Sequence, residues 1–365
     1  MEKKGQYNSR LIIVVIILLC VGVVMVYSAS HHIAFKQVKD SNFFVKRHVQ
    51  RVIIGILAMI VAILVPYDRL LRFSKWFLVI GLLFLVAIYF VGVDVNDQAK
   101  RWIRIGSVQF QPVDFARLCL IIYHSEAMAR KQKYIQDFKQ GLLPQAIVLV
   151  AYTALLMFQP DLGSALLLAC IAMTIFATAG AKIKHLVLIS ISGSLFALFI
   201  KGYQIERVKS FVESIKMGKP ISYQIEQSLI ALGNGGWFGV GLDHSTQKLQ
   251  FLPQPFTDFI FSIVGEEFGF VGVTAVLFLF LLVIVEGYRI ALSAPDEGAR
   301  LLATGLTTSI ALYAFVNAGV VSNLLPTKGL PMPFISYGGS FTVSMLISVG
   351  ILVNISHYCA TKSRG

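Results

Sequence analysis

The segment FLPQPFTDFIFSIVGEEFGFVGVTAVLFLFLLVIVEGY, residues 251–288, joins a polar loop to a long apolar run. Asp258 stands at the junction, directly after the proline-rich stretch at 251–257. An apolar run of this length is long enough to cross the roughly 30 Å hydrocarbon core of a bilayer. Placing a carboxylate at the edge of such a run costs free energy, and such carboxylates commonly have a functional role. The junction therefore predicts a membrane protein and a place for its chemistry.

The rest of the chain repeats the apolar pattern. It is 56% hydrophobic and 14% charged, with a mean hydropathy of +0.74, whereas soluble domains are about a quarter charged. We expect one all-α polytopic membrane domain over residues 1–365, with a large extracytoplasmic loop at about 202–257 between the seventh and eighth spans. The ten expected spans are 11–29, 49–65, 75–93, 113–129, 143–158, 162–180, 184–200, 258–288, 301–322 and 337–357.

Loop charges predict the orientation. Ten spans place both termini on one side, and the short segments there carry about twice as many Lys and Arg as those opposite. We therefore expect both termini in the cytoplasm and the 202–257 loop outside. The net charge of +13 is then largely a matter of topology, and it does not indicate a nucleic-acid partner. Outward-facing cations suit anionic lipid headgroups, although ordinary solvation of the loops explains any single lysine as well.

A helix start with a charged pair follows the second outer loop. Pro112 suits the first helical turn because its missing N–H needs no partner there. Asp114 then lies where the helix dipole favours a negative charge, and Arg117 follows at i+3 on the same face. The pair is either a structural cap or a pair of charges inside an internal cavity.

Three other stretches carry weaker signals. The glycine-rich stretch 233–241 lacks the Gly-Lys-Ser/Thr ending of a phosphate loop, so we expect its glycines to permit close backbone packing. The proline- and glycine-rich stretch 323–340 either lines a watery cavity or forms a stiff surface turn. Glu266 and Glu267 point away from Asp258 on an ideal helix, and we interpret them as interhelical polar contacts.

Taken together, the motifs resemble the SEDS family (shape, elongation, division and sporulation), typified by FtsW and RodA. The resemblance covers nearly the whole chain and is specific because many short blocks occur in the family's order. These blocks are Val26–Ser30, Arg101–Ile103, Gln111-Pro112, Gln159–Gly163, Gln227–Ala231, Phe251–Pro253, Thr257–Phe261, Gly265–Glu267 and Pro333–Ser340.

The resemblance implies a peptidoglycan glycosyltransferase that polymerises lipid II at the outer membrane face and releases undecaprenyl diphosphate. Asp258 would then be the general base that deprotonates the acceptor hydroxyl, and a helix-capping role for it is the alternative. The diphosphate leaving group needs cations rather than an acid. The candidate substrate-binding residues are Arg47, Arg101, Trp102, Arg104, Asp114, Arg117, Lys248 and Lys328. A divalent cation, Mg²⁺ or Mn²⁺, is plausible as a cofactor.

Some positions depart from the family pattern. The family commonly has Ser-Glu after Gln-Pro and a lysine further on, where this chain has Val113, Asp114 and Arg117. Charge signs are kept, but the reach of the side chains changes. The stretch Pro326–Leu330 resembles the cell-division branch, FtsW, more than the elongation branch, RodA.

Two other functions remain open at this stage. A lipid II flippase would also need an internal charged cavity, and a non-catalytic division scaffold would not need Asp258. The resemblance further implies lipid II as substrate, a class B penicillin-binding protein with transpeptidase activity as partner, and contacts with other division proteins. It also implies a location in the bacterial cytoplasmic membrane, at the septum for the division branch.

Overall fold

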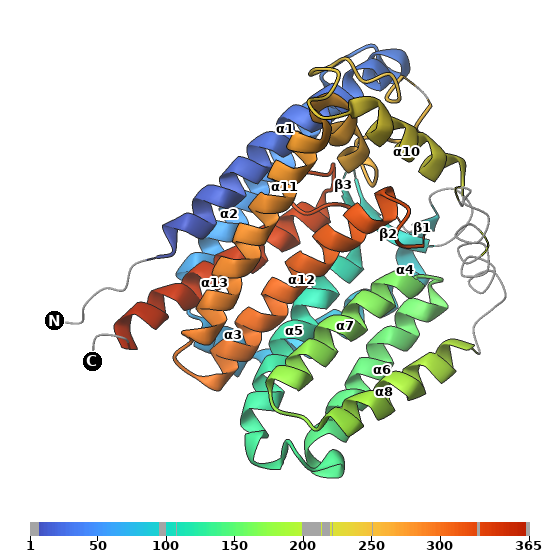
Figure 1. The fold of residues 1–365 in the computed structure, drawn as a ribbon. Helices are drawn as coiled ribbons and strands as arrows, with labels where there is room; N and C mark the ends of the chain where they lie inside the picture. Colours follow the sequence, from blue (N-terminus) through green and yellow to red (C-terminus); the bar gives the residue numbers. More distant parts are fainter. Residues whose placement is uncertain are drawn as a thin grey trace.

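The structure is a computed structural model that describes residues 7–94, 100–106, 108–198, 213, 220, 222–249, 251–326 and 329–362. Helices dominate it, as Figure 1 shows. The long helices are α1 (Ser9–Val38), α2 (Phe43–Leu64), α4 (Ser74–Val91), α5 (Pro112–Arg130), α6 (Leu143–Phe158), α7 (Leu162–Thr178), α8 (Ile183–Leu198), α11 (Ile260–Leu292), α12 (Glu297–Val321) and α13 (Ser340–Lys362). The shorter ones are α3 (Tyr67–Arg72), η1 (Gln132–Tyr134), η2 (Phe138–Leu142) and α10 (Tyr223–Gly235).

Each of the ten expected spans coincides with one of the long helices. Within the described residues, seven helices are both long and apolar enough to cross a membrane. They are α1, α2, α4, α6 together with η2, α11, α12 and α13. The polytopic helical class is therefore confirmed. The count of ten membrane crossings stays a prediction, because α5 carries charges and α7 and α8 are short.

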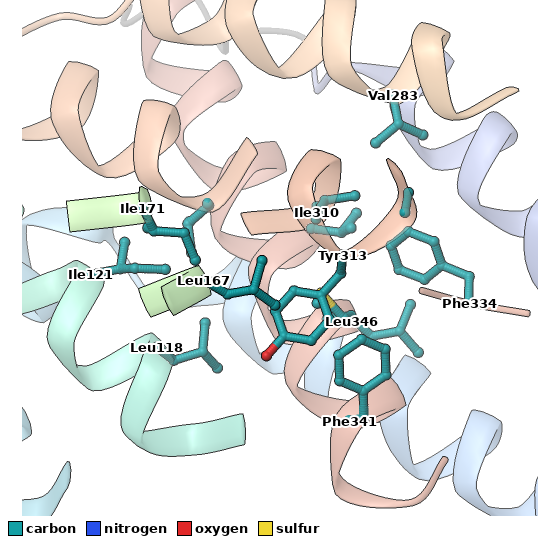
Figure 2. Packing of buried hydrophobic residues seen from close by; sticks show 14 of the residues in the cluster. Leu118, Ile121, Leu167, Ile171, Val283, Ile310, Tyr313, Phe334, Phe341 and Leu346 are labelled. Atoms are coloured by element: carbon teal, nitrogen blue, oxygen red, sulfur yellow. The ribbon is translucent and has the colours of Figure 1, made fainter. Parts of the chain in front are cut away.

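The helices pack side by side with α12 near the centre (Figure 1). The first residue of α1 and the last of α13 lie at the same end of the bundle, and α10 lies at the opposite end. The core is built from apolar side chains of α5, α7, α12 and α13, which meet around Tyr313 (Figure 2). Because α12 and α13 present almost no apolar surface outward, they form the rigid centre on which the outer loops rest.

A small sheet adds to the expected all-α architecture. The strands β1 (Gly92–Asp94), β2 (Lys100–Ile105) and β3 (Val108–Phe110) form an antiparallel sheet in the order β1-β2-β3. It fills the second outer loop directly before Pro112, the first residue of α5. The sequence predicted no strands there. The strands are short, and residues 95–99 between the first two contain no turn signature of the Asn-Gly kind that would announce a hairpin.

Helix α11 is broken at Gly269, whose φ of 66° and ψ of −163° are not helical. The break frees backbone groups that the glycine-rich stretch satisfies. Val240 and Gly241 donate their N–H groups to the carbonyls of Glu266 and Glu267 (2.9 and 3.0 Å). In return, the N–H groups of residues 270 and 271 reach the carbonyls of 236 and 237 (2.9 and 3.1 Å). We call residues 236–241 the glycine clasp. The expectation that these glycines permit close backbone packing is confirmed.

Glu266 and Glu267 of α11 fasten the loop that follows the clasp. Glu266 accepts hydrogen bonds from the side chain of Ser245, from the N–H and hydroxyl of Thr246 and from the N–H of Gln247. Glu267 accepts from Ser28 of α1 (2.5 Å), which is the interhelical contact expected of it. Glu266 also accepts from Asn234 of α10 (3.4 Å), so it too makes an interhelical contact, and its other partners lie in the loop. These contacts hold the segment 245–249 against the short helical piece 260–268, directly after Asp258.

Candidate functional site

Asp258 lies at the end of a tight turn at 251–259, and α11 begins two residues later. The N-cap position of α11 is held by Phe259. The carboxylate of Asp258 lies against Gly329 of the last outer loop, so close that a methyl group on that glycine would collide with it. The residue predicted to be the base therefore stands where two loop segments meet, both of them predicted to face outside.

Three hydrogen bonds to backbone carbonyls fix that meeting. The N–H of Tyr337 donates to the carbonyl of Phe256 (2.9 Å). The side chain of Asn317, on α12, donates to the carbonyls of Asp258 (2.7 Å) and Leu330 (2.6 Å). The stretch 323–340 was predicted either to line a cavity or to form a stiff turn. Within this stretch, Gly329, Leu330 and Tyr337 contact the Asp258 turn directly or through Asn317, so it is a constituent of this junction.

Tyr337 also joins the junction to the outer end of α2. Its ring contacts Phe44 and Phe256 edge-on, with centroids 5.7 and 5.4 Å apart. The guanidinium of Arg51 lies over the same ring at 4.6 Å and close to Gly339. Arg51 was not among the predicted cations. Its signal was available, because it lies one helical turn beyond Arg47 on the same face of α2.

The predicted Asp114–Arg117 pair forms, with an N–O distance of 4.0 Å and both side chains 2% exposed. The N-terminus of α13 completes it. Ser340 donates to Asp114 (2.7 Å), and Arg117 donates to Ser344 (3.0 Å). The guanidinium also stacks on Tyr313, with its central carbon 4.5 Å from the ring centroid.

Aromatic rings from α12 and α13 surround the pair, and Figure 2 shows Tyr313 and Phe341 side by side there. Two guanidinium nitrogens of Arg117, Nε and Nη1, are buried without a hydrogen-bond partner among the described residues. The structure therefore shows a charged pair that is buried in protein and packed between α5, α12 and α13. A functional role for the pair stays a prediction.

The other predicted cations are dispersed. Arg101 and Trp102 lie on β2, and the Arg101 guanidinium donates to the carbonyl of Pro160 (2.6 Å). Arg104 is exposed on the same strand, and Arg47 is exposed over the ring of Phe43 (4.2 Å). Lys328 lies outside the described residues, one position before Gly329. A role for these side chains in binding substrate stays a prediction.

Lys248 occupies a different setting from the one expected of an outward-facing cation. It is 1% exposed, and its ammonium contacts Ser28 (2.9 Å), Glu267 (3.0 Å) and Asp243. Burial favours the neutral form of Asp243, but the hydrogen bond and charge of Lys248 outweigh it and hold the pKa of Asp243 below its usual value. The ammonium is thus engaged by two carboxylates, and its place in substrate binding also stays a prediction.

The carboxylates do not gather into a metal cage. Among the described residues, no group of three or more His, Cys, Asp or Glu side chains is arranged to hold a metal ion. Glu266 and Glu267, the acidic side chains nearest in sequence to Asp258 on α11, are used by the loop contacts described above. The described residues alone do not fit a resident metal.

Comparison with known proteins places the chain in a family. A sequence model of the cell cycle proteins FtsW, RodA and SpoVE matches residues 9–361. The chain belongs to the FtsW/RodA/SpoVE family. Relatives of this family include a probable peptidoglycan glycosyltransferase FtsW of Geobacter sp. (strain M18), 38% identical over 100% of both chains. Stage V sporulation protein E of Bacillus subtilis (strain 168) is also 38% identical, over 98% of both.

Solved structures of the same family confirm the fold. RodA of Thermus thermophilus, the rod shape determining protein, aligns with a TM-score of 0.72 and 25% identity over 96% of both chains. A chain from a peptidoglycan synthase complex that coordinates polymerization and crosslinking aligns with a TM-score of 0.79. It is 24% identical and covers 97% of this chain and 98% of its own. The full-length match shows that the chain has the polytopic helical fold of these structures.

Proposed function

We propose that this protein is a peptidoglycan glycosyltransferase that polymerises lipid II into glycan strands at the outer face of the cytoplasmic membrane. The observation that carries the proposal is the fixed carboxylate of Asp258 at the junction of two outer segments. Family relatives named as probable peptidoglycan glycosyltransferases support it over the full chain length. The flippase and the scaffold have no such support from these relatives.

In the proposed reaction, Asp258 removes a proton from the acceptor sugar hydroxyl. The oxygen attacks the anomeric carbon of the donor, and the bond to the diphosphate breaks, which releases undecaprenyl diphosphate. A general base of this kind contributes about 10²–10⁴-fold to the rate. The departing diphosphate carries its own negative charge, so cations assist it. Arg51, at the edge of the junction, joins the predicted cations Arg47, Arg101, Arg104 and Lys328 as a candidate.

The biological role we propose is septal wall synthesis during cell division. The relatives with 38% identity are FtsW and a sporulation protein, whereas RodA matches at 25% identity. We propose a septal location, cytoplasmic termini and contacts with other division proteins. The partner we propose is a class B penicillin-binding protein. The synthase complex that shares this fold combines polymerization with crosslinking, and this motivates the choice of a crosslinking partner.

Polymerisation of lipid II by the purified protein in detergent tests the proposal, with and without the partner. The decisive variant is Asp258→Asn, which keeps the size of the side chain but cannot accept the proton. We expect glycan synthesis to fall by about 10²-fold or more. The matched control is Asp296→Asn, because Asp296 caps α12 at the other end of the molecule and Asn caps a helix as well as Asp does.

Each rival function predicts a different result. A flippase shows no activity in detergent, where no second compartment exists, and a scaffold retains its function without Asp258. If Asp258→Asn makes glycan at near the wild-type rate, Asp258 is not the general base. Dependence on Mg²⁺ or Mn²⁺ is a separate proposal, since the described residues form no metal cage. Adding each ion or EDTA to the same reaction measures it.

A further inference from the structure

Asn317 is a buried amide that connects two distant parts of the chain. It lies near the outer end of α12 and is 1% exposed. Its side-chain nitrogen donates to the carbonyl of Asp258 at 2.7 Å and to the carbonyl of Leu330 at 2.6 Å. A carboxamide nitrogen has two N–H donors, so these bonds use both of them.

The orientation of the amide follows from its neighbours. Both neighbours are carbonyl oxygens, which accept only, so the NH₂ side must face them. The Oδ1 atom of Asn317 is buried and has no hydrogen-bond partner among the described residues. Leaving a buried acceptor unpaired is unfavourable. The unpaired acceptor therefore occurs where the two N–H donors of the same amide connect the Asp258 turn to the segment at Leu330.

The tie controls where the carboxylate of Asp258 stands. Leu330 follows Gly329 directly, and the carboxylate of Asp258 lies against Gly329. Asn317 therefore sets the distance between the main chain of Asp258 and the main chain of Leu330. The carboxylate of Asp258 lies next to that second segment. The helix that carries Asn317 is buried in the bundle core, so the anchor is rigid.

We propose that Asn317 is a positioning residue for Asp258: its amide fixes the aspartate against the stretch 329–330 of the loop between α12 and α13. The inference rests on the function proposed above and deepens it. Asn317 touches neither the sugar nor the diphosphate in this account, so it acts on turnover through the base. A misplacement of about 1 Å in a reacting group lowers the rate by about 10²-fold.

Three variants separate positioning from packing. Asn317→Ala removes both donors, Asn317→Asp keeps the shape but presents oxygen to both carbonyls, and Asn317→Gln keeps both donors on a longer arm. We expect Asn317→Ala and Asn317→Asp to lower kcat for lipid II polymerisation by about 10²-fold with KM within a few-fold of wild type. Asn317→Gln should retain more activity than Asn317→Asp, although it fits the space less well.

The matched control is Asn354→Ala. Asn354 is also a buried amide with two backbone partners, the N–H of Tyr67 (2.9 Å) and the carbonyl of Ile63 (2.7 Å). It lies in α13, on the far side of the molecule from Asp258. Thermal unfolding of every variant gives the folded fraction, and rates are compared per folded molecule. Asn354→Ala should lose stability but keep kcat.

The following results would contradict the positioning role of Asn317. The proposal is overturned if Asn317→Ala keeps kcat within about threefold of wild type, if Asn317→Asp equals or exceeds Asn317→Gln, or if Asn354→Ala loses kcat as strongly. If Asn317→Ala does not fold, the order of the Gln and Asp variants decides alone. An inactive wild-type protein would instead defeat the proposed function. An active wild type, an inactive Asp258→Asn and unaffected Asn317 variants would defeat this inference alone.

Discussion

The absence of a side chain at Gly329 is what allows the Asp258 carboxylate to lie where it does. A Cβ added at that position would collide with Oδ2 of Asp258. The two groups belong to outer segments that Asn317 holds together, so neither can move away without breaking its bonds. We therefore expect Gly329→Ala to displace the carboxylate and lower polymerisation by about 10²-fold.

Initial rates of lipid II polymerisation check this expectation, together with thermal unfolding. The control is Gly233→Ala in α10, where an added Cβ meets no atom within 4 Å. Equal rates for Gly329→Ala and wild type would show that the carboxylate has room to adjust.

Arg117 holds a charge inside the bundle and forms an ion pair with Asp114. Removing one member of a buried ion pair leaves the other uncompensated, which costs about 3–5 kcal/mol. We expect Arg117→Ala and Asp114→Ala each to lower the free energy of unfolding by an amount of this order. Denaturation in detergent micelles measures it, after insertion into the membrane is verified.

The double variant tests whether the two residues act as a pair. We expect Asp114→Ala combined with Arg117→Ala to be less destabilised than the sum of the single losses, because no lone charge remains. If the loss in the double variant equals the sum of the two single losses, the two residues do not interact. A double variant with wild-type polymerisation would show that the pair is dispensable for function.

Sequence rules located the residues whose roles depend on near neighbours. Proline at a helix start, Asp in the first turn and Arg at i+3 identified Asp114 and Arg117, and the loop–span junction identified Asp258. Asn317 was missed because its partners, Asp258 and Leu330, are far along the chain. The position of Arg51 one helical turn after Arg47 was visible in the sequence, but its contacts with Tyr337 and Gly339 were not. A lone asparagine in an apolar helix carries no signal for such a contact.

At the level of single elements, the broken helix α11 is the most consequential feature. Gly269 has a backbone conformation that essentially only glycine adopts, and an added Cβ would meet the backbone of Trp237 and Gly239. We expect Gly269→Ala to lower stability by about 1–3 kcal/mol from backbone strain, and by more because the clasp must move.

Protease resistance of the segment 236–249 and thermal unfolding provide the measurements. Gly193→Ala in α8 is the control, because its added Cβ meets nothing within 4 Å and its helical backbone accepts alanine. A Gly269→Ala protein as stable and as protected as the wild type would show that α11 can straighten without loss.

The break was not predictable from the pattern of residues. Apolar residues continue through 258–288, and glycine is common inside membrane helices. Only the combination of Gly269 with a second glycine-rich stretch, 233–241, specifies that two backbones meet. Nothing in the spacing along the chain states that these stretches face each other.

For the whole molecule, the orientation in the membrane is the property that the proposed chemistry requires. The first residue of α1 and the last of α13 share one end of the bundle, as Figure 1 shows, which agrees with the prediction of termini on one side. We expect a cysteine placed at the exposed His244 to react with a membrane-impermeant thiol reagent on intact spheroplasts. The background lacks the native cysteines, which are Cys20, Cys119, Cys170 and Cys359.

A cysteine at the exposed Lys133, in the turn after α5, serves as the cytoplasmic control and should react only after lysis. The neighbouring Ser245 is unsuitable as a reporter because it is buried against Glu266. The reverse labelling pattern would invert the topology and move the Asp258 junction to the cytoplasm.

Hydropathy predicted the whole-molecule architecture well because each span is long and the bilayer sets its length. All ten expected segments coincide with helices. The outer parts were predicted less well: the three-stranded sheet and α10 were missed, since short polar elements owe their form to tertiary contacts rather than to local pattern.

The interruption at Gly269 also bears on the order in which the protein is made. The helical piece at 260–268 is roughly 13 Å long, less than half the hydrocarbon thickness, so it cannot remain in lipid with its end uncovered. The clasp that covers it precedes it in the chain and is synthesised first. Asn317 and the stretch 329–340 emerge later. A nascent chain that ends before residue 330 carries the aspartate but lacks half of its surroundings, so the site is completed only near the end of translation.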